Sequence, residues 1–412
     1  MKILLLNLHS ALNLGDDAIM QATLRTLREA YPDAQIAVAA NDPGSWQKYD
    51  AIEVLSSLAT GVADPAQGRW RKRVFLMPLT AGLLLWATAG YRLLGARIQW
   101  GTPEQRRLLT CYYDADLVLS CGGGNFYAHR SLSPALIWAL LTLAFAVGLG
   151  KPVVMLPQSF GPIEGQLQRR LAHWTFNRVR LIMARERRSI AFVTDTLRVA
   201  TPVVLVPDLA FGLAQPVIGP VRHVPPRVGV TVIDRGAQSS SFRGQQGYED
   251  TLVTLLVRLA HEHDAQIHIF CQCYGPSPDQ DDRLVARRVY ERITQRGVET
   301  NLHISFRDAR DIIAAYGELD LLIGTRMHTG IFALCNAVPV LLIGYQPKAC
   351  GVMASFDLDR YCCDIMNLDA DALYALACEL LQRQAELRGY ITGHLTETLA
   401  RASTWIDFLK GI

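Results

Sequence analysis

Short apolar runs and longer amphipathic stretches alternate along the chain. The runs are rich in valine, isoleucine and leucine, which predicts buried strands, and the stretches between them have helical spacing. The first half contains predicted strands at Ile3–Asn7, Gln35–Ala39, Leu117–Ser120, Val153–Pro157, Leu181–Ala184 and Val203–Val206, and a helix over about Asp16–Ala30. Strands that alternate with helices predict a parallel sheet covered on both faces, which is the doubly wound α/β class.

The alternation stops at the proline-rich segment Gln215–Pro226 and then starts again. The second half contains predicted strands at Arg227–Ile233, Gln266–Phe270, Asp320–Ile323 and Val338–Ile343, and helices at Tyr248–His263 and Asp281–Thr294. A chain of 412 residues is long enough for two domains at about 100–200 residues each. We therefore predict an N-terminal domain over 1–215 and a C-terminal domain over 226–412, with the helical stretch Asp369–Leu409 crossing back over the first domain.

Two apolar stretches approach the length of about 20 residues that spans a bilayer. Leu132–Gly148 leads directly into a strand, which predicts a buried helix. Val74–Leu94 lies in an apolar insertion over about 69–107 and follows the basic run Arg69–Arg73. A basic flank with an apolar body is typical of segments that rest on anionic membranes. Peripheral membrane contact through 70–94 and a helix packed on the N-terminal domain both fit this pattern, whereas a membrane span is disfavoured because no second span accompanies it.

Charge and cysteine content narrow the class of protein. Lysine and arginine number 41 against 38 aspartates and glutamates, so the chain lacks the strong basic field that nucleic-acid binding requires. Secretion is not expected, because the N-terminus has no signal-peptide pattern. The nine cysteines match neither a disulfide framework nor a four-ligand zinc site, so we expect small buried side chains in a reducing cytoplasm.

Two candidate binding loops follow predicted strands, where parallel sheets bind their ligands. The first loop is Asn13-Leu14-Gly15-Asp16, in which Gly15 permits a tight turn and Asp16 can cap the next helix. The free N–H groups at the start of that helix can bind an anion, and Asn13 can contact the ligand. In Gly122-Gly123-Gly124-Asn125, the glycines let the main chain approach a ligand closely. Neither the dinucleotide fingerprint nor the Walker A pattern is present, so NAD is not predicted.

Two further loops bring polar side chains to the same edge. Leu156–Pro162 offers Gln158, and Ala184-Arg185-Glu186-Arg187-Arg188 offers arginines after a strand. A guanidinium holds phosphate or carboxylate through two hydrogen bonds at once. Arg185 could bind such an anion or pair with a carboxylate such as Asp208, and both alternatives stay open. Arg187 and Arg188 are expected to be solvated.

The strongest local signal is Gly324-Thr325-Arg326-Met327-His328, with Lys348 after the next strand. Arg326 and His328 stand two residues apart at a strand-to-helix turn, so a fixed charge and a group that titrates near neutrality can face one pocket. A histidine alone in a turn is more often a structural hydrogen-bonding group. The neighbouring arginine and the later lysine favour a catalytic role here.

In these motifs the chain resembles the polysaccharide pyruvyl transferase family, which includes enzymes of bacterial exopolysaccharide, colanic-acid and cell-wall polymer synthesis. The resemblance covers nearly the whole chain and diverges most around Arg69–Arg107. It rests on Asn13-x-Gly15-Asp16-x-Ala18-Ile19, Gly122-Gly123-Gly124, Gln158-Ser159-x-Gly161-Pro162, Ala184-Arg185-Glu186-x-x-Ser189, Pro207-Asp208-x-Ala210, Gly324-Thr325-Arg326-Met327-His328 and Tyr345-x-x-Lys348-x-x-Gly351.

The resemblance implies two Rossmann-like domains that face each other across a cleft, as in GT-B glycosyltransferases, with the acceptor on the N-terminal side and the donor on the C-terminal side. It implies phosphoenolpyruvate as co-substrate, no metal, and a saccharide acceptor, free or lipid-linked, that becomes a pyruvate ketal. Bound donor anions would favour the charged form of His328. The resemblance makes His328 the general acid and Arg326 a second catalytic residue. It assigns donor binding to Arg185, Lys348, Gly324 and Thr325. It assigns the acceptor or phosphate loops to Asn13, Gly15, Asp16, Gly123, Gly124, Asn125 and Gln158.

Two other functions compete with this one. A nucleotide-sugar glycosyltransferase of the same architecture would need a late carboxylate for the ribose hydroxyls, and Asp357 and Asp359 are the candidates. A non-catalytic binding protein that keeps the fold would be expected to lose His328, Arg326 or Lys348, yet all three are present.

Overall fold

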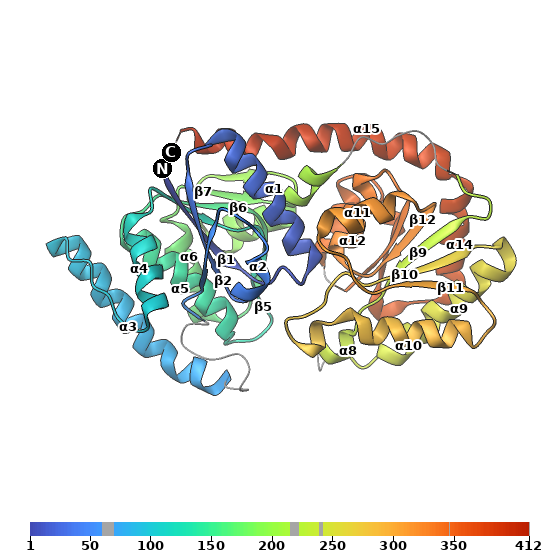
Figure 1. The fold of residues 1–412 in the computed structure, drawn as a ribbon, viewed down its shortest axis with the longest axis horizontal. Coiled ribbons are helices and arrows are strands. Elements are labelled where there is room, and N and C mark those ends of the chain that lie inside the picture. The colour runs from blue at the N-terminus through green and yellow to red at the C-terminus, as the bar shows by residue number, and fades with distance from the viewer. Residues whose placement is uncertain (60–69, 215–221, 239–241, 346, 412) are drawn as a thin grey trace. The chain divides into compact units, whose positions relative to one another are not determined.

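The computed structural model of the chain describes residues 1–59, 70–214, 222–238, 242–345 and 347–411; of 70–75 and 347–348 it describes the backbone alone. Contacts divide the chain into two compact units. Unit 1 comprises Met1–Ala11, Thr23–Leu209 and Thr404–Ile412, and unit 2 comprises Leu12–Ala22 and Ala210–Ser403. Each unit contains one parallel sheet with helices packed against it (Figure 1).

The sheet of unit 1 has eight strands. Their order is β3-β2-β1-β4-β6-β7-β8, and β5 pairs with the second half of β6. The strands are β1 (Lys2–Leu8), β2 (Gln35–Ala40), β3 (Glu53–Ser56), β4 (Leu117–Ser120), β5 (Gly123–Ala128), β6 (Val153–Ile163), β7 (Leu181–Ala184) and β8 (Val203–Leu205). They are parallel and mostly buried, so they have the near-continuous apolar composition from which the sequence predicted them.

The helices of unit 1 cover this sheet. α4 packs on β1 and β3, and α5 packs on β1, β5 and β6. The helices are α1 (Leu14–Ala30, whose first turns group with unit 2), α2 (Pro43–Trp46), α3 (Trp70–Leu94), α4 (Pro103–Asp114), α5 (Pro134–Gly148), α6 (Gln166–Phe176) and α7 (Arg187–Ala191). The prediction of a buried helix over Leu132–Gly148 is confirmed by α5, because Leu136, Leu140 and Leu143 on it are buried.

Unit 2 has a six-stranded sheet in the order β11-β10-β9-β12-β13-β14. The strands are β9 (Arg227–Thr231), β10 (Gln266–Phe270), β11 (Thr300–His303), β12 (Leu321–Gly324), β13 (Val340–Gly344) and β14 (Cys362–Asp364). Counted within the unit this is the order 3-2-1-4-5-6 of the Rossmann fold, and the first six positions of unit 1, β3-β2-β1-β4-β6-β7, repeat it once β5 is left out of the count. The predicted α/β class with two Rossmann-like doubly wound domains is therefore confirmed.

Six of the described helices of unit 2 lie between these strands in sequence, and two follow β14. α12 packs on β12 and β13, and α9 and α10 pack on β10. The helices are α8 (Arg235–Gln238), α9 (Gln245–His263), α10 (Asp282–Thr294), α11 (Ala309–Gly317), α12 (Met327–Cys335), α13 (Pro347–Ala354), α14 (Ala370–Gln382) and α15 (Gln384–Ser403). A 3-10 segment, Thr404–Leu409, follows α15 and groups with unit 1.

The segment Leu12–Ala22 belongs to unit 2, which differs from the predicted domain over 1–215. Backbone hydrogen bonds explain the difference. The N–H of Leu14 donates to the carbonyl of Gln272 at 3.1 Å, and the N–H of Tyr274 donates to Leu12 at 2.9 Å. The chain after β1 thus pairs with the loop after β10, a long-range contact that local sequence patterns do not encode. The predicted boundary residues 215–221 lie outside the described residues.

One cysteine pair differs from the expectation that all nine are small buried side chains. Cys350 on α13 and Cys362 at the start of β14 form a disulfide, with their Cα atoms 5.5 Å apart. The two cysteines are 12 residues apart in the chain, and the packing of α13 against β14 brings them together. Cys121, Cys271, Cys273 and Cys335 are buried thiols, as expected.

Candidate active site

The strongest predicted motif lies at the topological switch point of unit 2. In the sheet, β9 has β10 on one side and β12 on the other. The order of the strands therefore reverses between β9 and β12. Ligands of open α/β sheets bind in the crevice that opens there, outside the carboxyl ends of the strands. Thr231 ends β9, and Thr325, Arg326 and His328 follow β12 directly. These residues therefore lie where a ligand of this domain is expected.

A buried network of hydroxyl groups fixes the turn after β12. The N–H of Thr325 donates to Thr231 Oγ1 at 3.2 Å, and Tyr248 Oη and Thr325 Oγ1 are 2.7 Å apart. Thr329 Oγ1 donates to Gln272 Oε1 at 2.6 Å and lies 3.0 Å from Thr231 Oγ1. Burial raises the pKa of Tyr248, so this phenol stays a neutral partner. Buried hydroxyl groups that bond to one another and to Gln272 hold the turn in one conformation, which gives Arg326 and His328 a rigid base.

His328 lies against the first turn of α1. A Cβ atom added to Gly15 would stand 2.1 Å from Nδ1 of His328 and 2.5 Å from its Cγ. Gly15 is therefore needed for close packing against the imidazole, a reason that differs from the predicted tight turn. This contact brings the first and the sixth of the predicted motifs together within unit 2, so Gly15 belongs with the histidine rather than with the loops of unit 1.

The start of α1 is capped by Asn13, so the prediction that Asp16 caps this helix is wrong. Asn13 Oδ1 accepts from the N–H of Gly15 at 3.1 Å, and its Nδ2 donates to Asp16 Oδ2 at 3.2 Å. The N–H groups of Leu14 and Gly15 are both occupied by partners in the chain. The first turn of α1 thus offers fewer free donors to an anion than the sequence suggested, and Asp16 adds a negative charge beside it.

Arg326 is held by a buried carboxylate that the sequence analysis did not single out. Its Nε donates to Asp282 Oδ2 at 2.8 Å and its Nη2 to Asp282 Oδ1 at 2.5 Å, and only 12% of the Arg326 side chain is exposed. Burial alone would lower the pKa of Arg326, but the Asp282 carboxylate raises it well above its ordinary value. Nη1 has no hydrogen-bond partner within the described part of the chain, so one edge of the guanidinium can still donate to a ligand.

Arg235 is a second cation at this site, and sequence reasoning missed it. It begins α8, four residues after β9, and its guanidinium lies 5.0 Å from the centre of the Tyr345 ring. Tyr345 follows β13 and also acts electrostatically on Arg326. The signal that could have found Arg235 is its place just after the first strand of the domain. Lys348 lies on α13, but its side chain lies outside the described residues.

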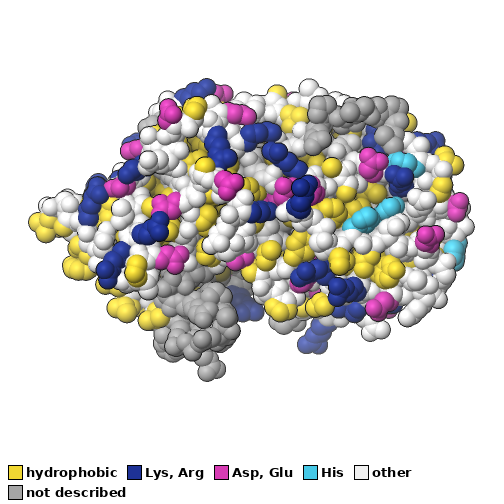
Figure 2. Space-filling view, in the orientation of Figure 1, with side chains coloured by type: hydrophobic (Ala, Val, Ile, Leu, Met, Phe, Trp, Pro, Cys, Tyr) yellow, Lys and Arg dark blue, Asp and Glu magenta, His cyan; other side chains and the backbone are white. Residues whose placement is uncertain are grey.

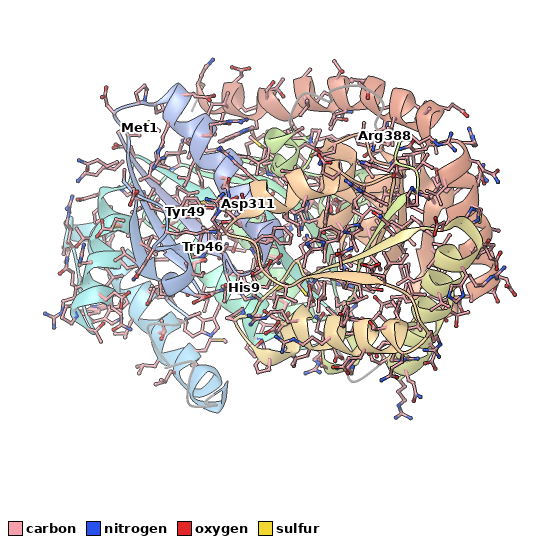
Figure 3. All side chains as sticks on the ribbon, turned by 45° about the vertical axis from the view of Figure 1, so that its right-hand side comes forward. Met1, His9, Trp46, Tyr49, Asp311 and Arg388 are labelled. Carbon is pink, nitrogen blue, oxygen red and sulfur yellow. A yellow bond between two sulfur atoms is a disulfide. The ribbon has the colours of Figure 1, made fainter. Side chains whose placement is uncertain are left out.

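The motifs of unit 1 gather at its own switch point, between β1 and β4. Asn125 Nδ2 donates to the carbonyl of Asn7 at 2.8 Å, and Asn7 Nδ2 donates to Ser120 Oγ at 3.2 Å. Gly123 has a φ of +139°, a backbone conformation that favours glycine. The indole of Trp46 donates to the carbonyl of His9 at 3.5 Å and thereby helps to hold the chain after β1 (Figure 3). This edge is built from glycines, amides and hydroxyls.

Arg185 forms an ion pair with Asp208, which is the structural one of the two predicted alternatives. The two side chains are only 4% and 2% exposed, and Arg185 Nη2 also donates to Ser159 Oγ at 2.8 Å. Ser159 in turn donates to Glu186 at 3.1 Å. The motif residues around β6 and β7 therefore form one internal network. With two of its nitrogens bound inside this network and its side chain buried, Arg185 has little surface left for a ligand.

The side chain of Gln158, on the same strand as Ser159, takes no part in this network. Its side chain is fully buried, yet neither Oε1 nor Nε2 has a hydrogen-bond partner in the part of the chain that the structure describes. It lies in β6 beside Gly123 of the triple-glycine loop. A buried amide without partners costs about 1–3 kcal/mol, so such a group calls for an explanation. A ligand that supplies the missing hydrogen bonds would provide one.

A cavity of about 750 Å³ lies elsewhere in unit 1. It is lined by residues at the amino ends of β1 and β2 and on α4, including Lys2, Gln35, Arg107 and Asp114. This is the edge of the sheet opposite to the predicted motifs, and no motif residue lines the cavity. We therefore place the candidate sites at the carboxyl ends of the strands of each unit: the arginines and the histidine in unit 2, and the unpartnered amide in unit 1.

Comparison with solved structures shows the class of fold. The chain is similar to a UDP-GlcNAc 2-epimerase from Neisseria meningitidis, with a TM-score of 0.59 and 13% identity over 100% of both chains. It is also similar to a glycosyltransferase from Rickettsia africae, with a TM-score of 0.57 and 13% identity over 99% of this chain and 97% of that one. These likenesses show the fold alone: the protein has the two Rossmann-like domains of the GT-B class.

Sequence comparison gives the family. The family model for polysaccharide pyruvyl transferase matches residues 13–347. The chain therefore belongs to the polysaccharide pyruvyl transferase family. It is also 24% identical, over 433 aligned positions that cover all of both chains, to the amylovoran biosynthesis protein AmsJ of Erwinia amylovora.

Proposed function

We propose that the protein transfers the pyruvyl group of phosphoenolpyruvate to a pair of hydroxyl groups on a saccharide, in the cytoplasm, during synthesis of a bacterial polysaccharide. Phosphoenolpyruvate is protonated at C3, which makes C2 electrophilic, and one sugar hydroxyl adds to C2. Phosphate then leaves from C2 and the second hydroxyl closes the ketal. Of the two hydroxyl protons, one balances the proton gained by C3 and the other leaves with phosphate.

The observation that carries this proposal is the grouping of His328 with Arg326 at the N-terminus of α12, at the switch point of unit 2. His328 at this helix start would protonate C3 as the general acid. The donor carries about three negative charges, so it needs several cations. The free edge of Arg326, the guanidinium of Arg235 and the ammonium of Lys348 supply them, and Gly324 and Thr325 shape the turn that presents the first of these.

The chemistry of unit 1 supports an acceptor role for its loops. Sugars are neutral and rich in hydroxyl groups, and the edge formed by Asn125, Gln158 and the glycines at 122–124 is likewise neutral and polar. The unpartnered amide of Gln158 can exchange hydrogen bonds with sugar hydroxyls. Because Arg185 is already paired with Asp208, we propose that the donor is held by cations of unit 2 rather than by Arg185.

The proposal is tested by incubating the purified full chain with phosphoenolpyruvate and a panel of free and lipid-linked saccharides. Phosphate release that depends on the acceptor, together with a new ketal methyl signal in the proton NMR spectrum of the product, is the expected result. His328→Ala should lower turnover by about 10²–10⁴-fold because it removes the acid. His261→Ala, which changes an exposed histidine on α9, is the matched control and should keep normal turnover.

Other outcomes assign a different function. If no acceptor elicits phosphate release and calorimetry detects binding of a nucleotide-sugar instead of phosphoenolpyruvate, the protein is a glycosyltransferase. If His328→Ala retains near-normal turnover, pyruvyl transfer stands and the assignment of the acid is wrong.

A further inference from the structure

The outer face of α3 is apolar, which is unusual for a helix on the surface of a domain. Leu79, Leu85, Trp86, Leu93 and Leu94 are 60%, 72%, 58%, 80% and 82% exposed. Figure 2 shows apolar side chains gathered at the edge of unit 1 where Figure 1 places α3. Single exposed apolar residues are common, but surface helices normally direct polar residues outward.

The opposite face of α3 explains how the helix is held. Leu84 and Ala87 are buried in the core of unit 1, and Thr80 is also buried. The helix packs on α5, where the side chain of Thr88 closely approaches Gly148. Because this face fixes the rotation of α3, the exposed residues at 79, 82, 85, 86, 89 and 93 form one stripe along its outer side. The stripe is thus a fixed feature of the surface.

Charge around the stripe indicates which partner it meets. No aspartate or glutamate occurs between Pro65 and Pro103, whereas Arg69, Arg71, Lys72 and Arg73 precede the stripe in sequence and Arg92 lies at its end; Arg97, further on, is paired with Asp114 at 2.6 Å. A helix with an apolar face between basic ends is the arrangement that lies in the interface of an anionic membrane, where the apolar face enters the acyl boundary and the cations meet lipid phosphates. Trp86 suits this depth because its ring is amphipathic.

The size of the stripe argues against a second copy of the chain. Residues 78 to 94 extend about 24 Å along the helix, so a stripe about 10 Å wide covers about 240 Å². A stable protein interface buries about 800 Å² on each partner. Among the described residues, no helix is long and apolar enough to cross a membrane. A surface of this size and charge fits shallow contact with lipid.

We propose that the outer face of α3 docks unit 1 on an anionic lipid surface. The contact uses Leu79, Leu85, Trp86, Leu93 and Leu94 as the inserted side chains, and Arg92 together with the basic run that precedes the stripe in sequence adds electrostatic attraction. It does not depend on the chemistry at the switch points. If the protein does not bind lipid, the proposed pyruvyl transfer is unaffected. If pyruvyl transfer is not found, the proposed lipid contact is likewise unaffected.

The test is co-sedimentation of the full chain with vesicles of phosphatidylcholine alone and with vesicles that also contain about 30% phosphatidylglycerol, which supplies the anionic headgroups that basic residues attract. Binding is expected to the anionic vesicles and to fall as salt is raised. Leu85→Ser combined with Trp86→Ser should weaken binding at least about tenfold, because two exposed apolar side chains are lost from the inserted face. The matched control is Leu167→Ser with Trp174→Ser, an exposed leucine and tryptophan on α6 beside arginines, which should bind as the wild type does.

Three results would overturn the proposal. The first is no binding to either kind of vesicle, and the second is binding that the α3 variant leaves unchanged. The third is a dimer in analytical ultracentrifugation that the α3 variant abolishes while vesicles are not bound, because the occupant would then be a second copy. Thermal unfolding of each variant checks that it is folded; if the α3 double variant is unstable, Leu93→Ser alone replaces it.

Discussion

The two switch points share one topology and differ in their chemistry. In unit 1, Asn7, Ser120 and Asn125 form a neutral edge, and the arginine that follows β7 is locked to Asp208. In unit 2, the arginine that follows β12 is also paired with a buried carboxylate, but it keeps one free edge and stands with His328 and Arg235. An arginine in a motif after a strand therefore does not by itself identify an anion-binding site. Each guanidinium has two nitrogens bonded within the protein, and what separates the two is exposure: the remaining Nε of Arg185 is buried, whereas the Arg326 side chain is 12% exposed against 4% for Arg185.

The largest expected effect is the loss of stability when either buried ion pair is broken. Asp282→Asn and Asp208→Asn should each destabilise the fold by about 3–5 kcal/mol, because each leaves a buried guanidinium without its partner. Chemical denaturation measures this loss. The exposed Asp33→Asn is the control and should stay within about 0.5 kcal/mol of wild type.

The KM for phosphoenolpyruvate in the same two variants separates the roles of Arg326 and Arg185. Asp282→Asn should raise the KM for phosphoenolpyruvate, whereas Asp208→Asn should leave it unchanged in the folded fraction. An equal rise in both would mean that Arg185 also holds the donor, as the family resemblance implied.

Gly15→Ala tests whether the packing of the imidazole matters for turnover. The added methyl group cannot fit 2.1 Å from Nδ1, so the ring of His328 must move. A displaced general acid should lower kcat by about 10–100-fold, with little change in overall stability. Gly247→Ala on α9 is the control, since nothing lies within 4 Å of the added atom and its kcat should be normal. Unchanged kcat in Gly15→Ala would show that the histidine works in another position.

Arg235→Ala tests the cation that sequence reasoning missed. Loss of a charged hydrogen bond worth about 1.5–3 kcal/mol should raise the KM for phosphoenolpyruvate about 10–100-fold and change kcat less. Arg310→Ala, an exposed arginine on α11, is the control and should keep the wild-type KM. Steady-state kinetics with varied phosphoenolpyruvate separate the two constants. An unchanged KM would leave Arg235 as a packing partner of Tyr345.

The smallest expected effect is at the neutral edge of unit 1. Gln158→Met removes a buried amide that makes no hydrogen bond to the described residues, so stability should rise by about 1–3 kcal/mol, while the KM for the acceptor rises about tenfold. Gln168→Met is the matched change, because the Gln168 amide donates to the carbonyls of Arg130 and Ser131 and its loss should cost about 1–3 kcal/mol. If Gln158→Met instead destabilises the protein and leaves the KM unchanged, the amide is structural.

The sequence alone determined the α/β alternation, the two doubly wound domains and the place of each motif just after a strand. These follow from hydrophobic spacing and turn chemistry within a few residues, which a single chain displays directly. It also brought Arg326 and His328 to one turn, since they are two positions apart.

Only the tertiary structure decided which partner each group takes. Asp282 and Arg326 are 44 residues apart, Arg185 and Asp208 are 23 apart, and Gly15 reaches His328 because the chain after β1 pairs with the loop after β10. Which side of α3 remains exposed depends on its packing against α5. Such choices are set by contacts between distant segments and by the burial those contacts create, and no local pattern records them.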